Sequence, residues 1–306
     1  MAISTKIIKQ RIRSIKNTHK MTRAMEMVSA SKMRKAVNRS LASRPYAWRA
    51  LELLINISRD RVVNHPLMEN RKKINSVLLV IVGSNKGLCG SFNVNVFRFL
   101  HDYVKSNSQF EIKAVTIGRY AERYAKKLNI PVVGSFVDFH EGIEVEEVRG
   151  VSKLVQQEFL SGSCDKVQLI YTNYVSVLKN EVINRGLLPV HPDNISFMIE
   201  HAGGVKDNQD RQSDKVESMS LYLFEPSEEE VLNLVLPILT EVQIYQGILE
   251  SQASEHSARM MAMRNASEAA EDMIRELTLT YNKARQESIT TEISEISAGA
   301  EALRQA

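Results

Sequence analysis

The chain has 306 residues, of which 43% are hydrophobic, 25% are charged and 6% are aromatic. This composition is typical of a folded globular protein and excludes an intrinsically disordered one. No stretch of about 18 uncharged apolar residues occurs and the N-terminus has no apolar core, so the sequence predicts neither a membrane-spanning helix nor a secretory signal. The two cysteines, Cys89 and Cys164, lack metal-ligand spacing and need not pair.

The two ends of the chain carry opposite charge. Residues 1–49 contain 13 Lys and Arg side chains and one acid, whereas residues 225–306 contain 15 acids and 6 Lys and Arg. A basic block is also typical of nucleic-acid or membrane binding, but no aromatic side chain lies among these charges before Tyr46. We therefore predict that the two ends attract each other and that no nucleic acid is bound.

The first predicted element is a long helix over residues 3–58. No glycine occurs before Gly83, and apolar residues recur at steps near three and four, which predicts a seam against a second helix. Pro45 predicts a kink or break near Arg44. The predicted seam consists of Ile8, Ile12, Ile15, Met21, Met25, Val28, Ala36 or Val37, and Leu41.

Residues 74–200 alternate between predicted strands and helices. The β-branched run at 77–82 is typical of a strand buried on both faces. Strands that alternate with helices predict a mostly parallel sheet covered on both faces. After 77–82 the predicted strands are 111–117, 130–137 and 166–174, with 182–189 as a candidate edge strand, and the predicted helices are 93–105, 119–128 and 145–161.

A polar linker at 201–218 precedes a second long helix over 227–285. Ser227 is the predicted N-cap, with Glu230 as its capping-box partner. Such a helix is roughly 90 Å long, so something outside a compact globule must cover part of it. Its heptad seam is Val231, Val235, Ile238, Val242, Tyr245, Leu249, Gln252, His256, Met260, Met263, Ser267, Ala270, Ile274, Leu277, Tyr281 and Ala284. Pro237 predicts a local bend, and the two steps of four between Gln252 and Met260 form a stutter.

The glycine-containing loop at 83–91 lies between a strand and a helix, where a phosphate-binding loop would lie. Its glycine spacing fits neither the dinucleotide nor the P-loop pattern. We interpret it as a tight turn shaped for a partner subunit, and a nucleotide-binding enzyme built on the α/β domain is the alternative. The seven histidines show no paired metal-ligand spacing, so no metal is expected.

Several segments resemble the gamma subunit family of F-type ATP synthases. They lie near both ends and in the middle of the chain, so the resemblance covers it almost entirely. The segments are 17–18, 24–35, 43–46, 84–90, 222–227, 254–256, 259–263, 282–286 and 289–296. One departure is Asn85, since the family usually has an acid at this place in the loop.

The resemblance implies an α/β fold class in which the terminal helices form a long antiparallel two-helix coiled coil beside a central Rossmann-like α/β domain. The implied divisions are an N-terminal coiled-coil helix at 1–60, the α/β domain at 74–200, a linker at 201–220 and a C-terminal coiled-coil helix at 221–306.

The resemblance also implies a non-catalytic rotor subunit without a cofactor, which couples rotation of the membrane c-ring to the catalytic beta subunits. Its implied partners are the alpha, beta, delta and epsilon subunits and the c-ring. Its implied location is peripheral, on the cytoplasmic side of the cell inner membrane, or the matrix side in a mitochondrion. The implied interface residues are Arg23, Met25, Lys32, Arg34, Arg259, Met263, Gln286 and Glu292, with a foot-domain loop of Lys86, Gly87, Leu88, Cys89 and Gly90.

Overall fold

The computed structural model describes residues 5–60, 65–71, 73–137, 139, 142–191 and 227–305. The chain divides into two compact units: unit 1 comprises Met1–Val28 with Met260–Ala306, and unit 2 comprises Ser29–Arg259. The linker expected at 201–220 lies outside the described residues. Two long helices, α1 (Thr5–Asp60) and α7 (Glu228–Gln305), contribute to both units.

The remaining elements all belong to unit 2. They are β1 (Ser76–Val82), α2 (Phe92–Ser106), β2 (Glu111–Ile117), α3 (Arg119–Lys127), β3 (Val132–Phe136), α4 (Val145–Leu160), β4 (Lys166–Tyr174) and β5 (Asn180–Leu188). The order of strands and helices predicted from the sequence is confirmed, with the bounds of β2 and β4 matching residue for residue.

Neither proline interrupts its helix. α1 continues through Pro45 and α7 through Pro237, so the break expected near Arg44 does not occur. The predicted start of α7 is confirmed, because the hydroxyl of Ser227 accepts a hydrogen bond from the backbone N–H of Glu230 at 3.2 Å.

The five-stranded sheet has the order β3-β2-β1-β4-β5. β1 pairs in parallel with β2 and β4, and β2 pairs in parallel with β3, as the alternation of strands and helices predicts. β5 is the antiparallel edge strand, and it begins slightly before the predicted 182–189 segment. The pairing of β1 with β4 ends at Ile81 and Ile170, so the last four residues of β4 extend beyond this pairing.

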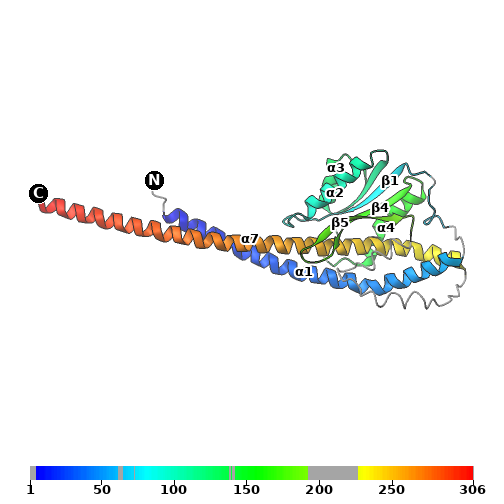
Figure 1. The fold of residues 1–306 in the computed structure, drawn as a ribbon, viewed down its shortest axis with the longest axis horizontal. Helices are drawn as coiled ribbons and strands as arrows, with labels where there is room; N and C mark the ends of the chain where they lie inside the picture. The colour runs from blue at the N-terminus through cyan, green and yellow to red at the C-terminus, as the bar shows by residue number, and fades with distance from the viewer. Residues whose placement is uncertain are drawn as a thin grey trace. The chain divides into compact units, whose positions relative to one another are not determined.

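Alternate residues of β1 point into two separate cores. Val77, Leu79 and Ile81 face α2 and α3, whereas Leu78, Val80 and Val82 face α4 and α7. All six side chains are buried, since a parallel strand in the middle of a sheet is covered on both faces. Figure 1 shows α2 and α3 on one side of the sheet and α4 on the other.

Within unit 2, α7 is a core helix of the α/β domain. Leu232, Leu236 and Leu239 are at most 1% exposed and belong to the same apolar cluster as α4 and the sheet. The predicted heptad seam is correct here at Val242, Tyr245 and Leu249, which are buried. It is wrong at Ile238, which is 41% exposed while its leucine neighbours are buried. The helix packs on the sheet as well as on α1, so more than one face of it is apolar.

By length and composition alone, α7 is apolar enough between Glu229 and Ala300 to cross a membrane. However, 67% of its most apolar 18-residue segment is buried inside the protein. The packing against the sheet therefore accounts for this apolar stretch.

The seam predicted for α1 is correct at Ile8 and Ala36 and wrong at Met21 and Val28. Ile8 is 3% exposed, whereas Met21 is 65% and Val28 is 51% exposed. The neighbouring Thr22 and Ser29 are buried instead. Small polar side chains allow close helix approach, so the buried stripe of α1 includes polar positions that its apolar pattern does not mark.

In unit 1 the heptad predicted for α7 is confirmed. Met263, Ser267 and Ala270 are buried, and the later seam positions 274, 277, 281 and 284 are partly buried between exposed residues. From residue 285 to residue 300 every side chain is exposed. This end of α7 therefore offers a long uncovered surface.

Candidate functional site

The candidate site is built around the loop at 83–91, where β1 ends and α2 begins. The backbone N–H of Gly83 donates to the carbonyl of Ile117 at 2.8 Å, which joins the carboxyl ends of β1 and β2. Gly118 has a φ of 93°, and a Cβ there would lie 2.3 Å from the carbonyl oxygen of Gly83. Only glycine therefore allows this close approach of the two strand ends.

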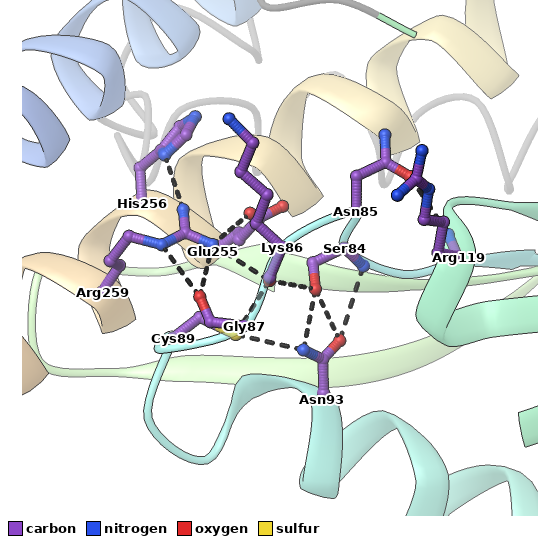
Figure 2. A network of polar contacts seen from close by, with 10 residues as sticks. All are labelled: Ser84, Asn85, Lys86, Gly87, Cys89, Asn93, Arg119, Glu255, His256 and Arg259. Atoms are coloured by element: carbon purple, nitrogen blue, oxygen red, sulfur yellow. Dashed lines mark hydrogen bonds and ion pairs between the residues drawn. The ribbon is translucent and has the colours of Figure 1, made fainter. Parts of the chain in front are cut away.

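Side chains inside the loop hold its shape (Figure 2). The hydroxyl of Ser84 donates to the carbonyl of Lys86 at 2.9 Å, and the amide of Asn93 donates to Ser84 Oγ at 2.7 Å and to Cys89 Sγ at 3.1 Å. Asn93 lies in the first turn of α2 and is 6% exposed. Leu88 has a φ of 61° and is 65% exposed, so the loop presents an apolar tip.

Arg259 of α7 fixes the loop from the other side. Its guanidinium donates to the carbonyl of Lys86 at 3.2 Å and to that of Gly87 at 3.2 Å and 3.3 Å. It also forms an ion pair with Glu255 at 2.6 Å and donates to His256 Nδ1 at 3.2 Å. Since arginine can only donate, His256 accepts through Nδ1. Figure 2 shows Arg259 reaching the loop, with Glu255 and His256 beside its guanidinium.

A cavity of about 500 Å³ lies between this loop and α7. Strand ends and Ile248 supply apolar walls, and the charged groups come from four different segments of unit 2. These charged groups are Lys32, Lys86, Arg119, Arg259 and Glu255. Four cations against one carboxylate make this cationic cleft suited to an acidic partner.

The loop does not present a phosphate cradle to the cleft. A phosphate loop offers backbone N–H groups, whereas here the carbonyl oxygens of Lys86 and Gly87 are directed to Arg259. Arg259 is 8% exposed and is engaged by these carbonyls and by Glu255. This arrangement disfavours a nucleotide-binding enzyme, although the cleft lies at the carboxyl ends of parallel strands, where open α/β sheets bind ligands.

Asn85, which stands in the place of the family's usual acid, connects three segments. Its Nδ2 donates to the carbonyl of Val137 at 2.8 Å, and its Oδ1 accepts from the backbone N–H of Arg119 at 3.1 Å. A carboxylate could accept from Arg119 but could not donate to Val137. The amide therefore ties the loop to the ends of β2 and β3.

Neither cysteine has the properties of a nucleophile. Burial raises the pKa of the Cys89 thiol, and the charge of Glu255 raises it further. Burial also raises the pKa of Cys164 to about 12. Within the described part of the chain, no group of three or more His, Cys, Asp or Glu side chains could hold a metal ion.

The residues implied by the family resemblance do not form one cluster. Lys32, Arg34, Arg259 and the loop belong to unit 2, and the others belong to unit 1. Arg23 pairs with Glu26 at 2.8 Å on its own helix. Met263 is 6% exposed within the helix seam, while Gln286 and Glu292 are exposed.

Sequence reasoning missed the contribution of Arg119 and the link between Arg259 and the loop. Arg119 could have been found, because only Gly118 separates it from the strand predicted at 111–117. The contact of Arg259 with Lys86 and Gly87 spans more than 170 positions. No local pattern signals such a contact.

Comparisons with known proteins agree over the whole chain. The family model described as ATP synthase matches residues 4–303. The ATP synthase gamma chain of Chloroflexus aurantiacus is 41% identical over 306 residues, covering 98% of this chain and 99% of the relative. That of Bdellovibrio bacteriovorus is 38% identical over 303 residues, with coverage of 98% and 99%.

Solved structures show the same fold. The rotor of the Euglena gracilis mitochondrial ATP synthase matches with a TM-score of 0.62 and 18% identity, over 94% of this chain and 99% of that one. The central stalk and c-ring structure of the Tetrahymena thermophila mitochondrial ATP synthase contains a chain that matches with a TM-score of 0.56 and 24% identity, over 81% and 99%.

Proposed function

The chain belongs to the gamma family of the F-type ATP synthase, as a non-catalytic central-stalk subunit, and from this premise we propose how it couples rotation to catalysis. Rotation of the membrane c-ring turns this subunit, and its asymmetric surface drives the catalytic beta subunits through their conformational cycle. The observation that carries the proposal is α7, a single helix of 78 residues whose surface is uncovered from 285 to 300.

The proposed partners are the alpha, beta, delta and epsilon subunits and the c-ring, with the subunit on the cytoplasmic side of the inner membrane. Of the divisions proposed, the helices at 1–60 and 221–306 form the shaft, the α/β domain at 74–200 forms the foot and 201–220 links them. Exposed apolar side chains on α1, Met21 at 65% and Met27 at 61%, support a surface that contacts partners in turn. Methionine suits such contacts because it adapts to different neighbours.

We propose further that Met25 and the cationic residues of α1 and of the cleft face acidic loops of the head, which the alpha and beta subunits form. Arg23, Met25, Lys32 and Arg34 form the α1 part of this surface. Lys86 is exposed on the cleft rim, and Arg259 acts by holding the loop that carries it. In this proposal the end of α7 beyond the buried Met263, where Gln286 and Glu292 are exposed, contacts the part of the head in which the tip of the shaft turns.

Purification of the tagged chain from membranes tests the assembly. We expect the alpha, beta and epsilon subunits to co-purify with it in fixed ratio, and recovery of the chain alone would contradict the proposal. A charge reversal tests the cleft: Lys86→Glu is expected to weaken assembly with alpha and beta, most at low salt because exposed charges are then least screened. Lys105→Glu, an equal charge change at the end of α2, is the matched control.

The alternative of a nucleotide-binding enzyme has its own test. Equilibrium dialysis of ATP against the isolated chain is expected to show no stoichiometric binding. Tight binding that Lys86→Ala abolishes would favour the alternative.

A further inference from the structure

Among the residues that the structure describes, none pairs with the end of β4 on the side of β1, and α7 takes that place. Because β1 pairs with β4 only as far as Ile170, the backbone groups of Thr172 and Tyr174 extend beyond it. The N–H of Thr172 donates to Ser251 Oγ at 3.0 Å, and the carbonyl of Thr172 accepts from Ser254 Oγ at 3.2 Å. Side chains of a helix thus satisfy backbone groups that a sheet would otherwise pair.

The same row of contacts continues along α7 in both directions. The N–H of Tyr174 donates to Glu250 Oε2 at 3.1 Å, and Ser257 Oγ donates to the carbonyl of Val177 at 2.7 Å. Residues 250, 251, 254 and 257 share one side of the helix, so a rotation of α7 about its axis would break all these bonds together.

Glu250 additionally reaches α1. Its Oε1 accepts from Ser40 Oγ at 2.7 Å and from Gln246 Nε2 at 3.4 Å. Gln246 also donates to Ser40 Oγ and accepts from Ser43 Oγ, both at 2.7 Å. One carboxylate therefore joins α1, α7 and β4, the two helices of the shaft and the domain that holds them.

This carboxylate is 2% exposed, and Ser40 is fully buried. Burial of a charge is unfavourable unless its hydrogen bonds are satisfied, and apolar side chains of similar size often stabilise a fold as well or better. A buried polar group that costs stability is best explained by the register it imposes, because apolar contacts are non-directional and tolerate sliding. Burial raises the pKa of Tyr174, and the neighbouring Glu250 raises it further.

We propose that Glu250 is a positioning residue that locks the axial and rotational register of α1 and α7 on the end of β4, and so transmits torque between the helix pair and the α/β domain. The inference rests on the rotor function proposed above. Every contact that carries it lies within unit 2.

The test uses ATP synthase assembled with Glu250→Leu in a host whose own gamma gene is deleted, studied in inverted membrane vesicles. Leucine removes the carboxylate and retains an apolar volume, so the bonds of Glu250 to Ser40, Gln246 and Tyr174 are lost while the apolar packing is retained. ATP hydrolysis is expected to continue, while protons pumped per ATP fall by about threefold or more, the scale on which residues of a coupling network act. The matched control is Glu241→Leu, which removes a carboxylate of α7 that pairs with Arg149 of α4 at 3.6 Å.

Each outcome decides the question. A pumping ratio for Glu250→Leu equal to that of the unsubstituted protein and of Glu241→Leu would overturn the inference. If Glu250→Leu does not assemble, Ser40→Ala, which removes the bonds of Ser40 to Glu250 and Gln246, is measured in its place. A reduced ratio for Ser40→Ala supports the inference, and an unchanged ratio overturns it. Absence of pumping with the unsubstituted chain would contradict the rotor function itself.

Discussion

The two halves of α7 lie in different surroundings, although they belong to one continuous helix. In unit 2 every side chain from 239 to 251 is buried, whereas in unit 1 every side chain from 285 to 300 is exposed. The first half is a core helix of an α/β domain. The second half is one helix of a coiled coil, and its end is an uncovered surface. A rotor subunit needs both, because one end must be held firmly and the other must contact partners without a permanent bond.

The largest expected effect comes from a pair of matched leucine truncations. Leu236 is fully buried in unit 2, and Leu279 is 72% exposed in unit 1. Leu236→Ala is expected to lower the free energy of unfolding by about 3 kcal/mol, from lost transfer energy and a cavity. Leu279→Ala is expected to change it by less than about 0.5 kcal/mol. Urea unfolding followed by circular dichroism measures both, and equal losses would refute the contrast.

Two glycines of α7 provide the second comparison. A Cβ at Gly247 would lie 2.8 Å from Leu169 Cδ2, in a buried contact with β4, whereas a Cβ at Gly299 meets nothing within 4 Å. Gly247→Ala is expected to cost about 1–3 kcal/mol through overpacking. Gly299→Ala is expected to raise helix stability by up to about 1 kcal/mol. Thermal unfolding measures both changes, and stabilisation by Gly247→Ala would contradict the close packing.

A carboxylate in each unit gives the third comparison. In unit 2, Asp165 accepts hydrogen bonds from the backbone N–H groups of Asn75 at 2.8 Å and Ser76 at 3.0 Å, which lower its pKa. Because the pKa of Asp165 is lower in the folded than in the unfolded chain, its ionised form stabilises the fold at any pH above the unfolded pKa, which is near 4. This stabilisation is lost as the pH falls from there through the pKa of the folded state. Asp165→Asn is expected to cost about 1–2 kcal/mol at neutral pH and to flatten the dependence of stability on acid.

Its control is Asp272→Asn in unit 1, which breaks only an exposed ion pair with Arg275. Less than about 0.5 kcal/mol is expected there. Urea unfolding repeated between pH 3 and about pH 7, the range that contains the carboxylate pKa values, makes the measurement. Parallel pH curves for Asp165→Asn and the unsubstituted chain would exclude the role assigned to Asp165.

The smallest expected effect concerns the loop that Arg259 holds. Arg259→Gln removes donors to Lys86 and Gly87, so the loop opens more often and the buried Cys89 thiol reacts faster with a thiol reagent. We expect about a tenfold increase, the factor that corresponds to 1.4 kcal/mol of local stability. Arg264→Gln removes an exposed ion pair with Glu268 and is expected to leave the rate unchanged. A rate unaffected by Arg259→Gln would contradict the proposed contact.

The sequence predicted the α/β order well, because the strands and helices of that domain differ sharply in period. It predicted the helix pair less well. Met21 and Val28 suggested an apolar seam, but Thr22 and Ser29 are the buried residues. Small polar side chains carry no hydrophobic signal, so their burial depends on the partner helix and cannot be inferred from one helix alone.

The burial of α7 in the sheet core was hidden for a related reason. Leu232 and Leu236 lie one position from the predicted seam residues Val231 and Val235, so a count of steps of three and four fits either face. For the candidate site, the loop was predictable from its place after β1. Its connection to Arg259 and the bonds of Glu250 to Ser40 and Tyr174 depend on tertiary contacts between distant segments.

Amide hydrogen exchange of the full-length chain, alone and after addition of the alpha and beta subunits, tests the contrast between the two halves of α7 most directly. In the free chain, we expect residues 239–257 to exchange only through global unfolding and residues 285–300 to exchange fast, because an uncovered helix end is marginally stable. With the partners present, protection should rise at 285–300 and stay unchanged at 239–257. Uniform protection along α7 in the free chain, or no change at 285–300 upon assembly, would contradict the account.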